Sequence, residues 1–169
     1  MPAEGRFTDI RFMVALLNNT LKSKMLETCI MKQQALIDDF KLRIQNLLDT
    51  PGLGNEDEYD NQELAQKSQV SVELTSLSEA LNFAQEELKV LLELKASNLK
   101  ARPSPALGSV VVTNRNTFFV GVSTEQFEVD GKSFIGLSMK SPLYNAMKGK
   151  VKGDKFSCKG ITYRILDVF

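Results

Sequence analysis

A helix-breaking segment divides the first hundred residues of this chain into two long amphipathic stretches. The breaker is Thr50–Gly54, which contains Pro51 and two glycines, and neither flanking stretch holds an internal Pro or Gly after Gly5. Proline and glycine are the residues that a helix interior tolerates least. The pattern therefore predicts helices over about residues 8–48 and 61–99, which return antiparallel on each other as a hairpin.

Apolar residues recur mostly every three or four positions in both predicted helices, which is the spacing of a coiled-coil seam, and the first seam is predicted to be weak near Gln33. The first seam is Ile10, Val14, Leu17, Leu21, Met25, Leu26, Ile30, Ile37, Phe40, Ile44 and Leu47, and the second is Val70, Leu74, Leu77, Leu81, Ala84, Leu88 and Leu91. Each helix would be about 55–60 Å long. A hairpin of that length has little core per residue, so we expect it to be supported at its base or used as a probe.

The segment between the helices is strongly acidic. No Lys or Arg lies between Arg43 and Lys67, and the same interval holds Asp49, Glu56, Asp57, Glu58, Asp60 and Glu63. Like charges gathered at one exposed point repel each other. The segment therefore predicts a site that meets a cation, either a metal ion or a basic surface. The plainer interpretation is a solvated loop whose acids favour the N-terminus of the second helix.

The periodicity changes after a proline-containing linker. Pro103 and Pro105 end the helical pattern and stiffen the connection. We therefore predict two domains, a hairpin over residues 1–100 with its acidic tip near 49–63, and a second domain over residues 101–169. β-branched and aromatic runs predict strands at 109–113, 117–122, 133–137, 155–158 and 161–168, with a turn at 129–132.

A short helix interrupts these predicted strands. Ser141 is a typical N-cap and Pro142 is typical of the first helical position, and the helix should end near Gly149. The second domain is therefore predicted to be an antiparallel sheet packed against one helix. Together the two halves indicate an α+β protein.

Composition narrows the chemistry that this chain can perform. There is no histidine, which excludes His-containing zinc sites and histidine-based nucleophile systems and leaves carboxylates, which favour magnesium, as the candidate metal ligands. Two distant cysteines, Cys29 and Cys158, predict a reducing, cytoplasmic compartment without a disulfide framework. The N-terminus lacks the apolar core of a signal peptide, and no apolar run approaches the roughly 20 residues that span a bilayer.

The zero net charge is unevenly divided. Residues 1–100 hold 11 basic and 16 acidic residues, whereas residues 101–169 hold 10 basic and 5 acidic residues. The basic half would suit an acidic protein surface or a nucleic acid. An excess of five charges does not by itself indicate nucleic-acid binding.

The chain from Ser138 to its end carries a recognisable set of residues, namely Ser141, Pro142, Leu143, Ala146, Met147, Gly149, Lys150, Gly153, Asp154, Ile165, Leu166, Asp167 and Val168. With these residues it resembles the C-terminal domain of the bacterial GreA/GreB transcript-cleavage factors. A helical hairpin of family-like length precedes them, in the family's domain order. The resemblance implies an FKBP-like C-terminal domain that docks on the rim of the secondary channel of RNA polymerase, here through Ser141, Pro142 and Leu143.

The resemblance also implies a role for the acidic tip. In this family, tip acids help to hold a magnesium ion at the polymerase active centre, and the polymerase itself then hydrolyses backtracked RNA. The family's tip pattern, Asp-x-x-Glu-Asn-x-Glu-Tyr, matches here at Asp57, Asn61 and Glu63, with Asp60 in place of Glu and Leu64 in place of Tyr. Asp57 and Asp60 are therefore the expected catalytic and metal-binding pair.

A second register of the same pattern aligns Glu58 and Tyr59 with the family's Glu-Tyr. It places Gly52 and Asn55 at the functional positions, which would abolish the chemistry. We favour the first register, because it keeps two acids three residues apart on one face of a helical first turn.

These observations predict an accessory transcription elongation factor rather than a stand-alone enzyme. Its partners would be RNA polymerase and, indirectly, the 3′ end of the nascent RNA, and its magnesium would be shared with the polymerase and bind weakly to the isolated chain. The alternatives are a polymerase regulator of the same fold without cleavage activity, and a generic coiled-coil adaptor.

Overall fold

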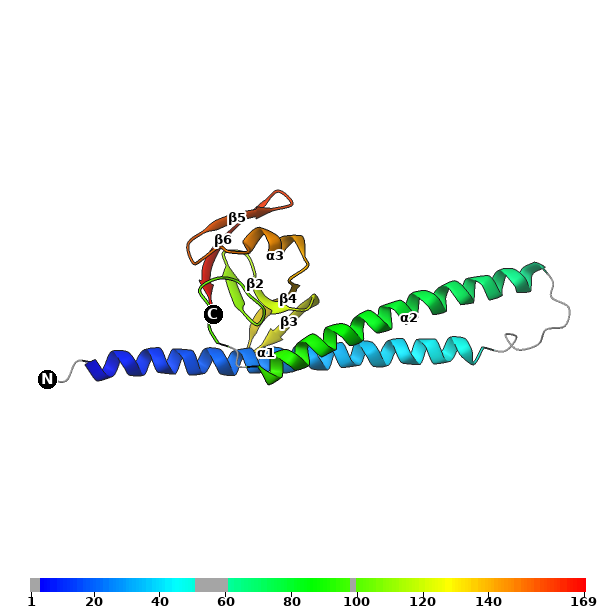
Figure 1. Cartoon of the computed structure of the whole chain (residues 1–169), viewed down its shortest axis with the longest axis horizontal. Helices are drawn as coiled ribbons and strands as arrows, with labels where there is room; N and C mark the ends of the chain where they lie inside the picture. The colour runs from blue at the N-terminus through cyan, green and yellow to red at the C-terminus, as the bar shows by residue number, and fades with distance from the viewer. Residues whose placement is uncertain (1–3, 51–60, 98–99) are drawn as a thin grey trace. The chain divides into compact units, whose positions relative to one another are not determined.

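A computed structural model describes residues 4–50, 61–97 and 100–169 of the chain (Figure 1). Two long helices, α1 (Glu4–Leu48) and α2 (Asn61–Ala96), are followed by a six-stranded sheet and a short helix, which confirms the predicted α+β class. The structure divides into two compact units. We call residues 31–89 the hairpin unit, and residues 1–30 together with 90–169 the sheet unit.

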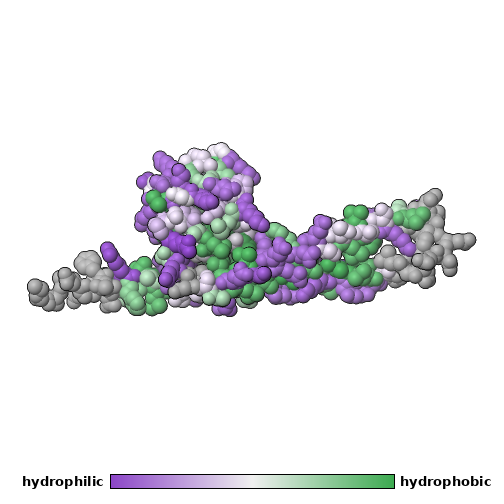
Figure 2. All heavy atoms as spheres, viewed as in Figure 1, coloured by the Kyte–Doolittle hydropathy of each residue, from purple (hydrophilic) through white to green (hydrophobic). Residues whose placement is uncertain are grey.

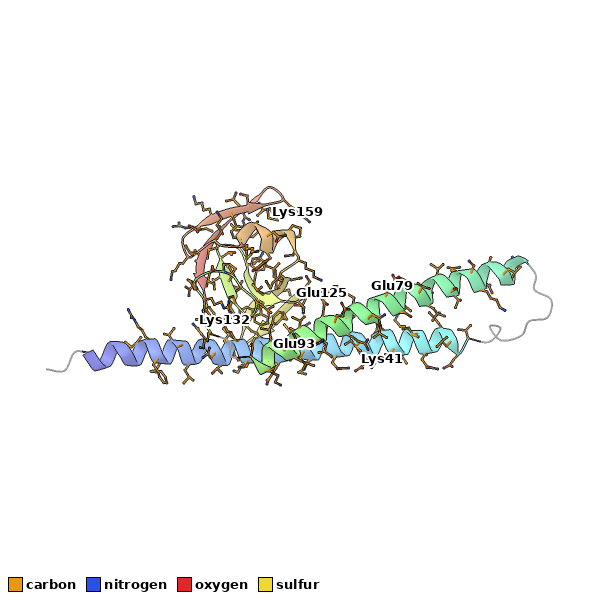
Figure 3. The ribbon with its side chains drawn as sticks, in the orientation of Figure 1. Lys41, Glu79, Glu93, Glu125, Lys132 and Lys159 are labelled. Carbon is orange, nitrogen blue, oxygen red and sulfur yellow. The ribbon has the colours of Figure 1, made fainter. Side chains whose placement is uncertain are left out.

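The hairpin unit consists of antiparallel parts of α1 and α2 (Figure 1). Ile37, Leu77 and Ala84 are its buried apolar residues, and the charged residues Lys41 and Glu79 are exposed on its surface (Figure 3). Gln33 is only 3% exposed, and its Nε2 donates hydrogen bonds to the Ala84 carbonyl oxygen at 3.0 Å and to Glu87 Oε2 at 3.1 Å. The predicted weak point of the seam is therefore a polar cross-link, which fixes the register of the two helices.

The sheet unit contains one six-stranded sheet in the order β3-β4-β2-β1-β6-β5. The strands are β1 (Val110–Thr113), β2 (Thr117–Gly121), β3 (Thr124–Val129), β4 (Lys132–Ser138), β5 (Lys155–Cys158) and β6 (Ile161–Val168). Adjacent strands pair antiparallel except β2 and β4, which pair in parallel. The short helix α3 (Pro142–Met147) lies between β4 and β5 in the chain.

The sheet differs from its prediction in two related ways. The sequence analysis missed β3, because Glu125, Gln126 and Glu128 are exposed and only Phe127 and Val129 point into the core. The expectation of a purely antiparallel sheet was also wrong. The β3–β4 hairpin returns the chain through Asp130 and Gly131, both with positive φ, so β4 runs in the same direction as β2.

Both faces of the sheet are buried. On one face, Val110 and Phe119 pack with Met25 of α1 and Leu91 and with other residues of α2. On the other face, Val111, Phe118 and Val120 pack with α3, β5 and β6. This two-sided burial accounts for the uninterrupted apolar run of β1, because neighbouring residues of a strand point to opposite faces.

The first of these cores joins residues that lie on both sides of the proline linker. Met25, Leu26, Cys29, Leu91 and Leu94 share it with residues of the sheet. The compact units therefore divide the chain within α1 and α2, whereas the predicted domains, 1–100 and 101–169, divide it at the linker. Independent folding of those two predicted domains stays a prediction.

The N-terminal part of α1 presents an apolar surface to solvent (Figure 2). Its exposed large side chains are Ile10, Phe12, Met13, Val14, Leu16 and Leu17. Three of these, Ile10, Val14 and Leu17, belong to the predicted seam, which is thus not covered in this part of α1. Within the described residues, no helix is long and apolar enough to cross a membrane.

The sheet unit also buries a lysine. Lys22 of α1 is 1% exposed, and its Nζ lies 5.9 Å from the centre of the Phe169 ring. Burial, and secondarily the charge of Arg102, lower the pKa of Lys22 from 10.5 to about 8. The charged form is therefore disfavoured in the folded protein.

We predict that Lys22→Met stabilises the protein at pH 7 by on the order of 2 kcal/mol, because methionine fills a similar volume without a buried charge. An unfolded Lys22 keeps its ordinary pKa, so between pH 8 and 10.5 the unfolded state binds more protons than the folded state. The contribution of this position to the free energy of unfolding should therefore rise with pH across that window in the wild type and not in the variant. Urea denaturation at pH 7 and pH 10 measures both effects.

Lys32→Met is the matched control, since Lys32 lies on the same helix and is exposed. It should leave both the stability at pH 7 and the pH profile within about 0.5 kcal/mol of the wild type. Equal stabilities of wild type and Lys22→Met at both pH values would contradict the predicted cost of the buried ammonium.

Candidate partner-binding surface

The predicted contact residues Ser141, Pro142 and Leu143 begin helix α3. Ser141 is the N-cap, and its side-chain oxygen accepts a hydrogen bond from the backbone N–H of Tyr144 at 3.1 Å. Pro142 follows at the start of the helix, where its missing N–H costs nothing. The sequence therefore fixes where α3 begins, as predicted.

Two buried side chains hold α3 against the sheet. Met147 is fully buried, and Tyr144 is 4% exposed. Both belong to the core that also contains Phe156 of β5 and Tyr163 of β6. The Tyr144 hydroxyl donates a hydrogen bond to the Pro105 carbonyl oxygen at 3.3 Å. The linker proline is thus tied to α3, which orients the outer residues of the helix.

The next motif residues have structural roles of their own. Gly149 and Gly153 have φ values of 75° and 96°, which glycine adopts readily and other residues adopt only with strain. The Asp154 carboxylate accepts a hydrogen bond from the Val151 N–H at 2.9 Å. The Gly153 N–H in turn donates to the Ile165 carbonyl oxygen at 2.8 Å. Many residues of the matching C-terminal motif therefore determine the local structure of α3 and of the loop that follows it.

A shallow apolar pocket of about 280 Å³ lies beside the start of α3. Its lining residues are Ser141, Pro142, Leu143, Cys158, Lys159, Ile161 and Tyr163. The end of β5, the β5–β6 turn and the start of β6 supply its second wall through Cys158, Lys159 and Ile161, and Lys159 has a φ of 50°. Ile161 is 43% exposed, so an apolar side chain of a partner could bury it.

The floor of this pocket is aromatic. Tyr163 stacks on Phe156 with ring centres 5.1 Å apart and an angle of 8° between the planes. It also meets Phe118 edge-on at 6.3 Å. Aromatic pairs of this kind contribute about 0.5–1.5 kcal/mol beyond the area that they bury, so they stabilise the position of Tyr163.

Among the described residues, one cation, Lys159, lines this pocket. The exposed lysines Lys148, Lys152 and Lys155 lie at the C-cap of α3, in the following loop and on β5. Lys152 pairs with Asp167 at 3.3 Å, and both side chains are well exposed. An apolar pocket that is lined by one lysine suits a partner surface that presents an apolar side chain beside a carboxylate.

The structure thus brings together the three predicted contact residues. It adds Cys158, Lys159, Ile161 and Tyr163, which the sequence analysis did not assign to a site. One sequence feature could have indicated this site. Ile161 directly follows the turn residue Gly160, and an apolar residue at an exposed end of a strand does not pack into a core.

The predicted catalytic pair, Asp57 and Asp60, lies outside the described residues. The preferred register of the tip pattern therefore stays a prediction. Asp49, at the described end of this segment, accepts hydrogen bonds from Gln45 Nε2 at 2.9 and 3.0 Å. Among the described residues there is no group of three or more Cys, Asp or Glu side chains that could hold a metal ion. Magnesium shared with a polymerase stays a prediction.

No protein-family model matches the chain, and no curated protein matches it.

We predict that Ser141→Ala lowers the free energy of unfolding by about 1 kcal/mol, because the N–H of Tyr144 loses its acceptor. Ser141→Asp should retain nearly full stability, since aspartate is an equally good N-cap. Ser123→Ala, at an exposed serine between β2 and β3, is the control and should have little effect. Urea denaturation measures all three. A Ser141→Asp variant as unstable as Ser141→Ala would contradict the capping role.

Proposed function

We propose that this chain is a Gre-type transcription elongation factor, which binds RNA polymerase and promotes cleavage of backtracked RNA by the polymerase. The observation that carries the proposal is the helical hairpin. Its two helices end and begin at Leu48 and Asn61, and the intervening segment holds five acids and no base. A hairpin with an acidic end can carry negative charge into a narrow channel, where a more compact domain would not fit.

Docking is assigned to the pocket beside α3. Its apolar residues, Pro142, Leu143 and Ile161, provide contact area, and Lys159 together with the net positive charge of residues 101–169 provides long-range attraction to an acidic rim. The interaction should weaken with salt, since exposed charges are screened over about 8–10 Å at physiological ionic strength.

The chemistry is assigned to Asp57 and Asp60, with Glu56, Glu58 and Glu63 as electrostatic support. Magnesium keeps several of its waters and needs only one or two carboxylates when other ligands come from elsewhere. When bound at the polymerase active centre, the ion would supply an activated water and stabilise charge on the phosphate. The two aspartates would add the carboxylates that complete its coordination.

A second candidate is a regulator that occupies the channel without promoting cleavage. It is favoured by Asp60, which stands where the family has Glu and is one methylene shorter, and by Leu64, which replaces Tyr. A generic coiled-coil adaptor would bind neither polymerase nor its elongation complex. Binding and cleavage assays separate these three functions.

For docking, we predict that Ile161→Asp weakens binding of the full chain to RNA polymerase by about tenfold or more, since it places a charge in an apolar contact. Leu166→Asp is the matched control, because Leu166 lies on the same strand, is 45% exposed, and does not line the pocket. It should bind as the wild type does. Affinity is measured by fluorescence anisotropy of the labelled chain at low and moderate salt.

If both variants lose affinity for RNA polymerase equally, the pocket is not part of the docking surface. No binding of the wild type at low salt would instead favour the adaptor.

For the chemistry, we predict that Asp57→Asn and Asp60→Asn each reduce stimulated RNA cleavage by about 100-fold or more, while polymerase affinity changes little. Stalled, backtracked elongation complexes are incubated with the protein and magnesium, and the short 3′ RNA fragments are counted. Asp38→Asn, an exposed acid of the hairpin unit, is the control and should cleave normally.

A wild-type protein that binds the complex and yields no fragments would identify the non-cleaving regulator. Normal cleavage by both tip variants would mean that the register is wrong, and Glu56 and Glu58 would be tested next.

A further inference from the structure

A second pocket, of about 340 Å³, lies in the sheet unit between α1 and the residues that follow α2. Its lining residues are Arg11, Val14, Ala15, Asn18, Asn19, Lys22, Lys100 and Ala101. It is separate from the pocket beside α3 and shares no residue with it. Its volume falls within the range of pockets that hold small molecules.

The charge of this pocket has one sign. Arg11, Lys22 and Lys100 line it, and its described lining contains neither Asp nor Glu. Arg102 adds a fourth positive charge close enough to Lys22 to act on it electrostatically. Cations gathered in a concave surface repel each other and concentrate the field within it, so the site favours an anion.

Lys22 is the exceptional member of this group. It lines the pocket and yet is only 1% exposed, so it belongs to the pocket floor. Its ammonium faces the Phe169 ring, and among the described residues no carboxylate forms an ion pair with it. Buried charges in proteins are ordinarily paired. Among the described residues, Lys22 has an aromatic ring and no carboxylate as its partner, and a ligand could supply the missing negative charge.

The pocket-lining residues of α1 lie on one side of the helix, as their spacing in the sequence shows. Arg11, Asn18 and Lys22 are separated by seven and four residues, which places them in a row along one helix face. The amides of Asn18 and Asn19 add hydrogen-bond donors and acceptors. Val14 and Ala15 complete the wall with apolar surface.

We propose that this pocket binds a phosphate-bearing small molecule, with Lys22 as its buried anchor and Arg11 and Lys100 as flanking contacts. A guanidinium can hold phosphate through two parallel hydrogen bonds, and an ammonium acts as a point charge beside it. Three lining cations suit a ligand with at least two negative charges, such as a diphosphate. The asparagine amides and the apolar wall leave room for an attached organic group.

The electrostatics of this pocket agree with the assignment. Its described charged lining residues, Arg11, Lys22 and Lys100, are cationic, and burial together with the charge of Arg102 lowers the pKa of Lys22 to about 8. A bound phosphate would favour the charged ammonium and raise that pKa. By linkage, the ligand should bind more tightly below pH 8 than above it.

The test uses the full chain and three probes, namely inorganic phosphate, pyrophosphate and ATP. Isothermal titration calorimetry at low salt should show saturable binding of pyrophosphate, with a weaker response to phosphate, since its charge is smaller. Lys22→Met and Arg11→Gln should each weaken pyrophosphate binding by about tenfold or more. Lys32→Met removes an exposed lysine of the same helix and should bind as the wild type does.

A pH series separates a site from general charge attraction. Wild-type affinity for pyrophosphate should fall between pH 7 and pH 9, and the residual binding of Lys22→Met should change less over that range. The proposal is overturned if no probe binds to the wild type, or if Lys32→Met weakens binding as much as Lys22→Met. It is also overturned if a short single-stranded RNA binds through Lys22 while pyrophosphate and ATP do not, because the ligand would then be a nucleic acid.

Discussion

Two-sided burial of the sheet is the constraint on which the sheet unit depends. Val110 and Val111, adjacent on β1, are both fully buried and belong to different cores. One core needs Met25, Leu26, Leu91 and Leu94 from α1 and α2, and the other needs Tyr144 and Met147 from α3. A sheet deprived of either cover would expose a face of Val and Phe residues. The helices that appear in the sequence as one long hairpin therefore also serve as the cover of the sheet.

Close backbone packing is the second requirement of the sheet. A Cβ at Gly136 would clash with the Thr124 side chain and would lie 2.6 Å from the Val122 carbonyl oxygen. The Gly136 N–H instead donates a hydrogen bond to the Thr124 hydroxyl at 3.1 Å, where the β3–β4 register shifts. The missing side chain thus allows the start of β3 to approach β4. An exposed ion pair, Lys24 with Asp130 at 2.9 Å, links α1 to the turn of the same hairpin and adds less, because both groups are half exposed.

Two pockets described in the sheet unit differ in their chemistry. The pocket beside α3 is apolar with an aromatic floor and one lining lysine, which suits a macromolecular surface. The pocket on α1 is lined by three cationic residues, which suits a small anion. The first accounts for residues that resemble a transcription-factor motif. The second involves Arg11, Lys22 and Lys100, to which no sequence motif drew attention, so the two proposals stand or fall separately.

The sequence by itself determined the elements whose signals are local. The helix-breaking sequence after Thr50 predicted two helices, and α1 ends at Leu48 and α2 begins at Asn61. Ser141 and Pro142 start α3, and glycines with positive φ mark the following loop. These signals work because capping and backbone strain depend on neighbouring residues alone. Only the tertiary structure decided that β3 joins the sheet, that β2 and β4 are parallel, and that Ile161 meets Leu143 at one pocket. It also decided that Lys22, which looks like any surface lysine of an amphipathic helix, is buried, because burial depends on what distant parts of the chain, here Phe169, place against it.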